Sequence, residues 1–308
     1  MVTLERLTLD FGASRRRMQV QKLRGVDFIA GYHDLAIRTG GLNIFPRLIA
    51  ANHHAPFAGD PTPSGVGALD ALPFWRPTAR HQHPDHGAGG FGKDHRSPAV
   101  SIAACERGEA ATLYQFDERI GTLMVRAKAM GMDLEKHIGA GRLTIRQIDP
   151  AEMSPGEFAA EVRDQIEARQ VRLIVIDSLN GYLAAMPQEK QLLLQIHEML
   201  SYLNQQGVVT LMINPQHGLV GPMASNLDVS YVSDTVIPIR FFEAGGRIRK
   251  AISVIKNRGG PHEDTIRELR IDGLGVRIGE PLIDFKGVTT GTPEYVGVSA
   301  PLMEDRSE

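Results

Sequence analysis

Apolar runs of strand length alternate with amphipathic helices from about residue 112 to residue 285. The runs are dense in Val, Ile and Leu, which is typical of strands buried on both faces of a sheet. This alternation predicts an α/β fold with a mostly parallel sheet and helices on both faces. The expected strands are residues 112–116, 143–148, 173–177, 208–214, 235–242 and 251–256.

Two of the helices have clear boundary signals. Ser154, Pro155 and Glu157 supply an N-cap serine, a first-turn proline and a capping-box glutamate, so a helix should run from here to about residue 170. A second helix should begin near Gln188 and end at Gly207, a natural C-terminal cap. Its apolar stripe is interpreted as core rather than as a cofactor-binding surface: residues 192, 196, 200 and 203.

The first 48 residues repeat a later segment of the chain. Lys22-Leu23-Arg24-Gly25 recurs 234 residues later as Lys256-Asn257-Arg258-Gly259. An arginine-rich turn and an apolar strand precede each tetrapeptide, and a histidine and an Ile-Arg pair follow it. Such a duplication predicts two tandem copies of one domain, the first present only as its last strands. The expected divisions are a remnant over 1–48, a Pro- and Gly-rich linker over 49–66, a full domain over 67–285 and a tail over 286–308.

Composition narrows the possible functions. Of the 308 residues, 42% are hydrophobic, and 34 basic residues are set against 36 acidic ones, so a constitutive nucleic-acid binder is disfavoured. The longest apolar runs have strand length, so we expect a cytoplasmic protein without a membrane segment. Cys105 is the sole cysteine, which excludes an internal disulfide and favours a small buried residue.

Carboxylates follow two of the predicted strands. The apolar run over residues 172–177 ends in Asp177, the Walker B arrangement in which an acid holds hydrated Mg²⁺ beside a nucleotide. An acid at a strand end is also a common loop or capping residue. The pair Asp117 and Glu118 ends another predicted strand, and one of these two carboxylates could act as a general base.

Together these segments resemble KaiC, the circadian clock ATPase and autokinase of the RecA superfamily, and its clock-unrelated relatives. The resemblance covers nearly the whole chain. It is carried by residues 22–25, 41–46, 63–66, 69–70, 117–118, 131–133, 176–179, 233–235 and 255–259 with His262.

The resemblance implies ATP and Mg²⁺ bound between the subunits of a hexameric ring. It makes Asp117 and Glu118 the catalytic carboxylates, and it makes Asp177 the magnesium ligand. Lys256 and Arg258 would reach the neighbour's γ-phosphate, unless they form ordinary surface ion pairs. The implied nucleotide-binding residues are Gly87, Gly92, Lys93, Asp94, Asp177, Ser178 and His262, and Ser230, followed by Ser225, is the candidate phospho-acceptor.

The phosphate loop departs from the family pattern. Residues 87–93 satisfy G-x-x-x-x-G-K, but Asp94 replaces the Mg²⁺-binding hydroxyl. Pro84 and Pro98 are expected to prevent the flanking strand and helix from forming normally, so ATP binding should be weak. We interpret the stretch as frame-displaced coding sequence, because one codon string for residues 81–95 encodes a family-like Walker A loop in a shifted frame.

Two other interpretations of the sequence remain open. Loss of the Mg²⁺-binding hydroxyl favours a non-catalytic interaction subunit that pairs with related subunits or with a signalling partner. Alternatively, His81, His83 and His86 could share a transition-metal ion, although no residues that would orient these imidazoles are evident.

Overall fold

The main body of the protein is built on a ten-stranded sheet. The computed structural model describes residues 1–8, 12–53, 70, 82–88, 96–183, 189–216, 233–258, 263–272, 275–290 and 293–297. The sheet has the order β14-β13-β11-β10-β5-β9-β8-β6-β7, and β12 pairs with β10. Its parallel part consists of β5 (Gln82–Ala88), β6 (Ala110–Gln115), β7 (Leu143–Gln147), β8 (Val171–Asp177), β9 (Val209–Gln216) and β10 (Thr235–Ala244).

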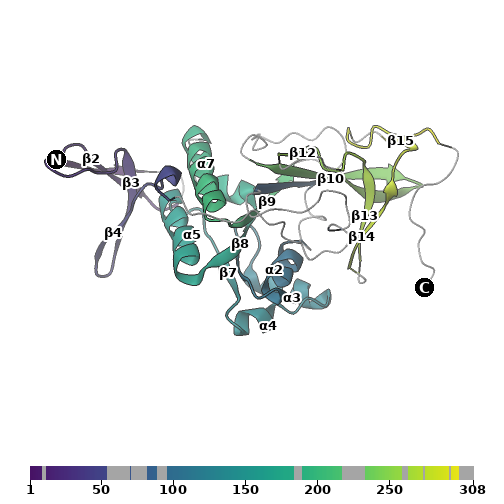
Figure 1. The fold of residues 1–308 in the computed structure, drawn as a ribbon, viewed down its shortest axis with the longest axis horizontal. Coiled ribbons are helices and arrows are strands. Elements are labelled where there is room, and N and C mark those ends of the chain that lie inside the picture. Colours follow the sequence, from purple (N-terminus) through teal and green to yellow (C-terminus); the bar gives the residue numbers. More distant parts are fainter. Residues whose placement is uncertain are drawn as a thin grey trace.

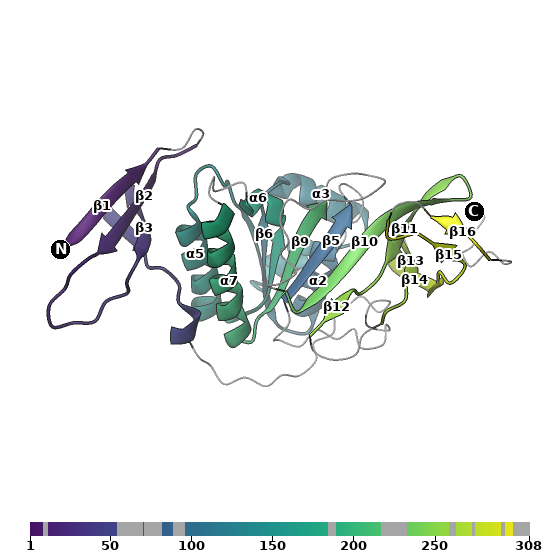
Figure 2. The same ribbon diagram turned by 90° about the horizontal axis from the view of Figure 1, so that it is seen from above.

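Helices cover both faces of this parallel sheet, as predicted (Figures 1 and 2). Side chains of β8 alternate between two cores: Ile174 and Ile176 pack with the helices of one face, and Leu173 and Val175 with those of the other. The α/β fold class is therefore confirmed. One face carries α5 (Pro155–Arg169) and α7 (Glu189–Gln205), and the other α2 (Arg96–Glu106), α3 (Ile120–Ala129) and α4 (Leu134–Gly139).

The two helices with boundary signals form close to the predicted residues. Ser154 caps α5 by accepting a hydrogen bond from the backbone N–H of Glu157 at 3.2 Å, and Gln170 ends the helix in the left-handed region. The Glu157 carboxylate is paired with Arg38. The predicted stripe on α7, residues 192, 196, 200 and 203, is buried in the core. On α2, Cys105 is buried as expected, and burial raises the pKa of its thiol.

One predicted strand is displaced. Residues 251–256 do not form a single strand, because β11 spans Arg247–Ile252 and only β12 (Lys256–Asn257) follows it. Gly245 and Gly246 both have positive φ, so they make a tight turn that places Arg247 directly opposite Ala244. The strand therefore starts straight after the turn. Antiparallel pairing continues through β13 (Arg267–Asp272) and β14 (Gly275–Pro281).

The two prolines beside the phosphate loop do not have the expected effect. Pro84 lies inside β5, where it occupies the parallel ladder opposite Met212, and Pro98 is the third residue of α2. A first-turn N–H has no partner within its helix, so Pro98 removes no helical hydrogen bond. The expectation that neither flank could form normally is wrong.

A separate four-stranded sheet precedes the main body and lies beside α5 (Figure 2). Its antiparallel order is β1-β2-β3-β4. The pair Leu35 and Ile44 in this sheet has the same register as Leu269 and Ile278, 234 residues later. The strands are β1 (Val2–Leu7), β2 (Arg15–Val20), β3 (Tyr32–Arg38) and β4 (Gly41–Phe45).

Polar contacts join this first sheet to the N-terminal end of α5. Asp34 accepts a hydrogen bond from the backbone N–H of Gly156 at 2.8 Å. A Cβ atom on residue 156 would lie 2.6 Å from the same Asp34 oxygen, so only glycine permits the contact. Arg15 donates to the carbonyl oxygens of Pro150 and Glu152 at 2.6 and 3.1 Å. The sheet is thus held by charged groups that bind backbone atoms.

The residues around the expected linker and tail also have defined positions. A short 3₁₀ helix, η1 (Ala50–Asn52), packs against α7, and the Ala50 N–H donates to Glu198 at 3.1 Å. β15 (Phe285–Lys286) and β16 (Glu294–Tyr295) form a hairpin, and Phe285 stacks edge-on against Phe242. Within the described residues, no helix is long and apolar enough to cross a membrane.

We predict that Asp34→Ala loosens the first sheet from α5. The change removes a carboxylate from a helix N-terminus, an interaction that contributes about 1 kcal/mol. Amide exchange at residues 156–158 should therefore become several-fold faster, as measured by hydrogen–deuterium exchange. Asp27→Ala, an exposed loop position in the same sheet, is the control. Equal exchange rates in the two variants would contradict the prediction.

Candidate functional site

The carboxyl ends of β6 and β8 lie side by side and bring together the acidic residues predicted from the sequence. Gln115 and Asp177 are directly paired across the two strands. The Asp177 side chain is buried, and its Oδ2 accepts hydrogen bonds from Ser97 Oγ at 2.8 Å and Gln115 Nε2 at 3.4 Å. A buried carboxylate at this edge of a parallel sheet is suited to holding a ligand or cation.

Asp117 is connected to the same place through Ser178. The Ser178 hydroxyl donates to Asp117 Oδ2 and accepts a 3.4 Å hydrogen bond from the backbone N–H of Gly181. Gly181 belongs to α6 (Leu179–Leu183), and a Cβ atom here would collide with Phe116 Cβ. The missing side chain allows α6 to start directly beside Asp117, whose carboxylate is therefore held by the residue that follows Asp177.

Glu118 points to a different partner. Its two carboxylate oxygens accept from Arg126 Nε at 3.2 Å and from Arg126 Nη2 at 2.5 Å. This bidentate pair holds the Glu118 carboxylate against α3. The two adjacent acids predicted from the sequence therefore have different environments, and Asp117 is the one linked to Asp177.

Lys256 and Arg258 lie elsewhere on the sheet. Lys256 in β12 is opposite Val236 at the start of β10, and β5 and β9 separate β10 from β8. Arg258 is half-exposed and forms a 3.7 Å ion pair with Asp234. In Figure 2, β12 and α6 lie at opposite ends of the parallel strands. The structure therefore does not bring these cations to the acids of the same chain.

The structure describes only some of the remaining predicted residues. Gly87 lies within β5, so it is part of a strand rather than of a loop. Side chains of His83 and His86 are not described, and among the described residues no group of His, Cys, Asp and Glu could hold a metal ion. Outside the described residues lie His81, Gly92, Lys93, Asp94, Ser225, Ser230 and His262.

Ser97 is a site residue that sequence reasoning missed. It is the second residue of α2 and fully buried, and its hydroxyl donates to Asp177, the acid predicted to bind magnesium. Its position, four residues after Lys93, was the available signal. In the phosphate-loop motif, the residue with the hydroxyl comes directly after the lysine. Ser97 lies three residues beyond Asp94 and therefore falls outside the motif.

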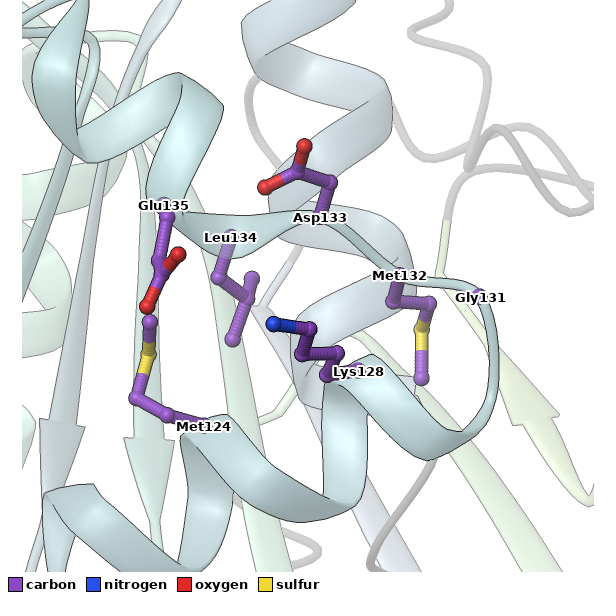
Figure 3. A pocket seen from close by; sticks show the side chains of 7 residues that line it. All are labelled: Met124, Lys128, Gly131, Met132, Asp133, Leu134 and Glu135. Carbon is purple, nitrogen blue, oxygen red and sulfur yellow. The ribbon is translucent and has the colours of Figure 1, made fainter.

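A pocket of about 250 Å³ lies between α3 and α4 (Figure 3). Its lining includes the motif Gly131-Met132-Asp133 but none of Asp117, Glu118 and Asp177. Gly131 has a positive φ, and Asp133 caps α4 by accepting from the Lys136 N–H at 3.0 Å. The motif therefore has a structural reason, a turn followed by a helix cap.

The protein has a parallel sheet flanked by helices, a buried acid at a strand end and a hydroxyl from the helix after the loop. These features are those of a RecA-like ATPase domain. The KaiC ATPase family model matches residues 86–283. The chain therefore belongs to the KaiC ATPase family.

Relatives of known identity agree with this assignment. The chain is 26% identical to the circadian clock oscillator protein KaiC of Acaryochloris marina over 307 residues, covering 96% of this chain and 57% of the relative. It has the same identity and coverage with KaiC of Synechococcus elongatus. With the circadian clock protein KaiC3 of a Synechocystis strain it is 27% identical over 290 residues, covering 92% and 56%. The chain thus spans little more than half the length of these relatives.

Proposed function

We propose that this chain is a KaiC-type module that binds Mg²⁺-ATP weakly through Asp177 and Ser97. The observation that carries the proposal is the 2.8 Å contact between the Ser97 hydroxyl and the buried Asp177 carboxylate. A hydroxyl and a carboxylate are the hard oxygen ligands that Mg²⁺ prefers, and this pairing is the one used beside phosphate loops. When bound, the ion would neutralise charge on the phosphates.

Ser97 would supply the hydroxyl that is absent at position 94. Ser97 follows Asp94 by three residues in the sequence, and α2 forms despite Pro98. Asp94 still adds a negative charge to a loop that must receive phosphates, which disfavours tight binding. Gly92, Lys93 and His262 complete the proposed nucleotide site by resemblance. We therefore expect binding that is measurable but weaker than that of relatives with a threonine at this position.

Asp117 and Glu118 are the candidate catalytic acids of the site. Asp117 is held by Ser178, the residue directly after Asp177, and this contact supports a role in which Asp117 accepts a proton from a water or hydroxyl at the phosphate. Glu118 would first have to leave Arg126. If the chain turns over ATP, Asp117→Asn should therefore be the more damaging of the two corresponding substitutions.

The test of the proposal is a titration with a fluorescent ATP analogue and Mg²⁺. Ser97→Ala should weaken binding by about tenfold, since a metal-bound hydroxyl is lost, a loss of roughly 1.4 kcal/mol. Ser101→Ala is the matched control, because this buried hydroxyl lies one turn further along α2 and donates to the Ser97 carbonyl. Equal affinity of the wild type and Ser97→Ala for the ATP analogue would show that Ser97 does not bind the metal ion.

We also propose that Lys256 and Arg258 act on a neighbouring subunit. Their separation from Asp177 along the sheet, the exposure of Arg258 and its long ion pair with Asp234 support this role. In the proposed arrangement, residues 1–48 are the end of a first KaiC-like domain and residues 67–285 form the ring-building domain. Because ring assembly would depend on nucleotide, we expect the chain alone to be a monomer or weak oligomer.

Co-assembly with an intact KaiC relative should expose this role. The chain should change the ATPase rate of the partner, and Lys256→Ala with Arg258→Ala should alter that effect, because the cations no longer reach the neighbour's phosphate. The control is Lys136→Ala with Lys286→Ala, which removes the same charge from two exposed positions. A mixed ATPase rate that the first pair leaves unchanged would show that the assignment is wrong.

The second candidate function is a non-catalytic subunit that binds relatives without turning over ATP. Asp94 favours it, because a carboxylate replaces the expected hydroxyl. In this case the chain still changes the ATPase rate of its partner, while Ser97→Ala does not change the affinity for the ATP analogue. The two functions are therefore separated by the same pair of measurements.

Autophosphorylation is a finer part of the proposal. By resemblance, the acceptor pair of the family aligns with Ser230 and Tyr231, and a tyrosine ring cannot place its hydroxyl where a threonine would. We predict phosphate on Ser230 at most, with Ser225 a poorer acceptor, when the chain is incubated with Mg²⁺-ATP and analysed by mass spectrometry. Stoichiometric phosphate on Tyr231 would contradict the alignment.

A further inference from the structure

Glu118 and Asp117 are adjacent in the chain but are held in different ways. The two carboxylate oxygens of Glu118 accept hydrogen bonds from Arg126 on α3, and the Glu118 and Arg126 side chains are only 24% and 20% exposed. Asp117 is exposed and accepts a hydrogen bond from Ser178 instead. One acid of the pair is therefore open to solvent, whereas the other is bound to a cation.

The Arg126 guanidinium depends on this ion pair. Its Nη1 atom is buried and has no hydrogen-bond partner among the described residues, and its Nε and Nη2 atoms both donate to Glu118. A charged group that is mostly buried loses more free energy than an exposed one when its partner leaves, because water does not replace the missing contacts. The arginine therefore opposes the release of Glu118.

The start of α3 does not compete for the Glu118 carboxylate. Glu118 directly precedes Arg119, the N-cap residue of α3, and no side chain caps this helix. An acid close to a helix N-terminus is commonly stabilised by the free backbone N–H groups of the first turn. Here the carboxylate instead contacts Arg126, the seventh residue of α3. The ion pair is thus preferred over a helix cap.

We propose that Arg126 is a positioning residue that keeps Glu118 out of ATP hydrolysis, an inference that rests on the proposed function. In hydrolysis the water oxygen bonds to the γ-phosphorus, the bridging P–O bond breaks with its electron pair going to ADP, and a carboxylate takes the proton of the water. While Glu118 is bound to Arg126, only Asp117 of the acidic pair can take this proton. Release of Glu118 adds a second acceptor, so Arg126 lowers the rate of hydrolysis.

The effect of Arg126 should fall on the rate of hydrolysis and not on the affinity for ATP. The contact between Ser97 and Asp177, which carries the proposed binding of Mg²⁺-ATP, involves neither Arg126 nor Glu118. Loss of the arginine therefore leaves the proposed metal ligands in place. Affinity measures the proposed function, whereas the rate at unchanged affinity measures the role of Arg126.

A matched ion pair lies at the other end of β6. Arg107 donates to both carboxylate oxygens of Glu109 at 3.2 and 2.9 Å, and their side chains are 27% and 30% exposed. Glu109 directly precedes β6, whereas Glu118 follows its carboxyl end. The two pairs share their chemistry and nearly the same exposure, but only one of them includes a candidate catalytic acid. Arg107 therefore provides the control for Arg126.

The test compares Arg126→Gln with the wild type in ATP hydrolysis and in the titration with the fluorescent ATP analogue. We expect hydrolysis about tenfold faster in Arg126→Gln at unchanged affinity, because a second carboxylate becomes available. Adding Glu118→Gln to this variant should return the rate to the wild-type value, since the gain requires the free carboxylate. Arg126→Lys, which keeps the charge but not the two parallel N–H donors, should give an intermediate rate.

Arg107→Gln, the matched control, should leave the rate of hydrolysis unchanged. Equal rates in Arg126→Gln and the wild type at equal affinity would overturn the inference. Slower hydrolysis in Arg126→Gln would overturn it too, because Arg126 would then hold Glu118 in an active position. Absence of analogue binding in every form would contradict the proposed function instead.

Hydrogen–deuterium exchange without nucleotide tests the ion pair itself. Exchange at residues 118–123 should be several-fold faster in Arg126→Gln and in Glu118→Gln, and no faster again in the double variant, because both changes break the same contact. Additive effects of the two changes would show that the side chains are not coupled and would overturn the inference. This measurement needs no ATP, so it tests the inference even where the proposed function fails.

Discussion

The parallel pairing of β8 with β6 and β9 is the constraint on which both the fold and the site depend. Because β8 is paired on both edges and buried on both faces, its side chains alternate between two helical layers. Each fully buried aliphatic side chain contributes about 1.5–3 kcal/mol to the stability of the fold. A shift by one residue would exchange the two cores. The same register sets Asp177 beside Gln115 and within reach of Ser97.

A different kind of contact joins the first sheet to this body. Asp34 accepts a hydrogen bond from the N-terminal end of α5, and Arg15 donates to two loop carbonyl oxygens. These charged side chains pair with backbone groups that have no partner within a helix or sheet. Such contacts depend on direction, so they fix the orientation of the sheet as well as its position. The face that carries Arg15 and Asp34 is thereby directed towards α5 and the loop before it.

Much of this arrangement could be predicted from local pattern. The capping residues of α5, the stripe of α7 and the acid at the end of β8 are each encoded within a few neighbouring residues. The start of β11 could not be predicted in this way, since it depends on the two glycines with positive φ before it. Pro84 and Pro98 were misjudged because the penalty for a proline depends on whether its position requires a donated hydrogen bond.

The two copies of the repeat separate what sequence encodes from what its surroundings decide. Leu35 with Ile44, and Leu269 with Ile278, are identical residues in identical register, so strand pairing is written into the local sequence. Burial is not, because Ile278 packs in a hydrophobic cluster of the main body while Ile44 is 47% exposed. The cluster in the main body includes Ala99 of α2, a helix remote in sequence from β13 and β14. An apolar face thus specifies that a partner layer is needed, and the topology decides which chain segment provides it.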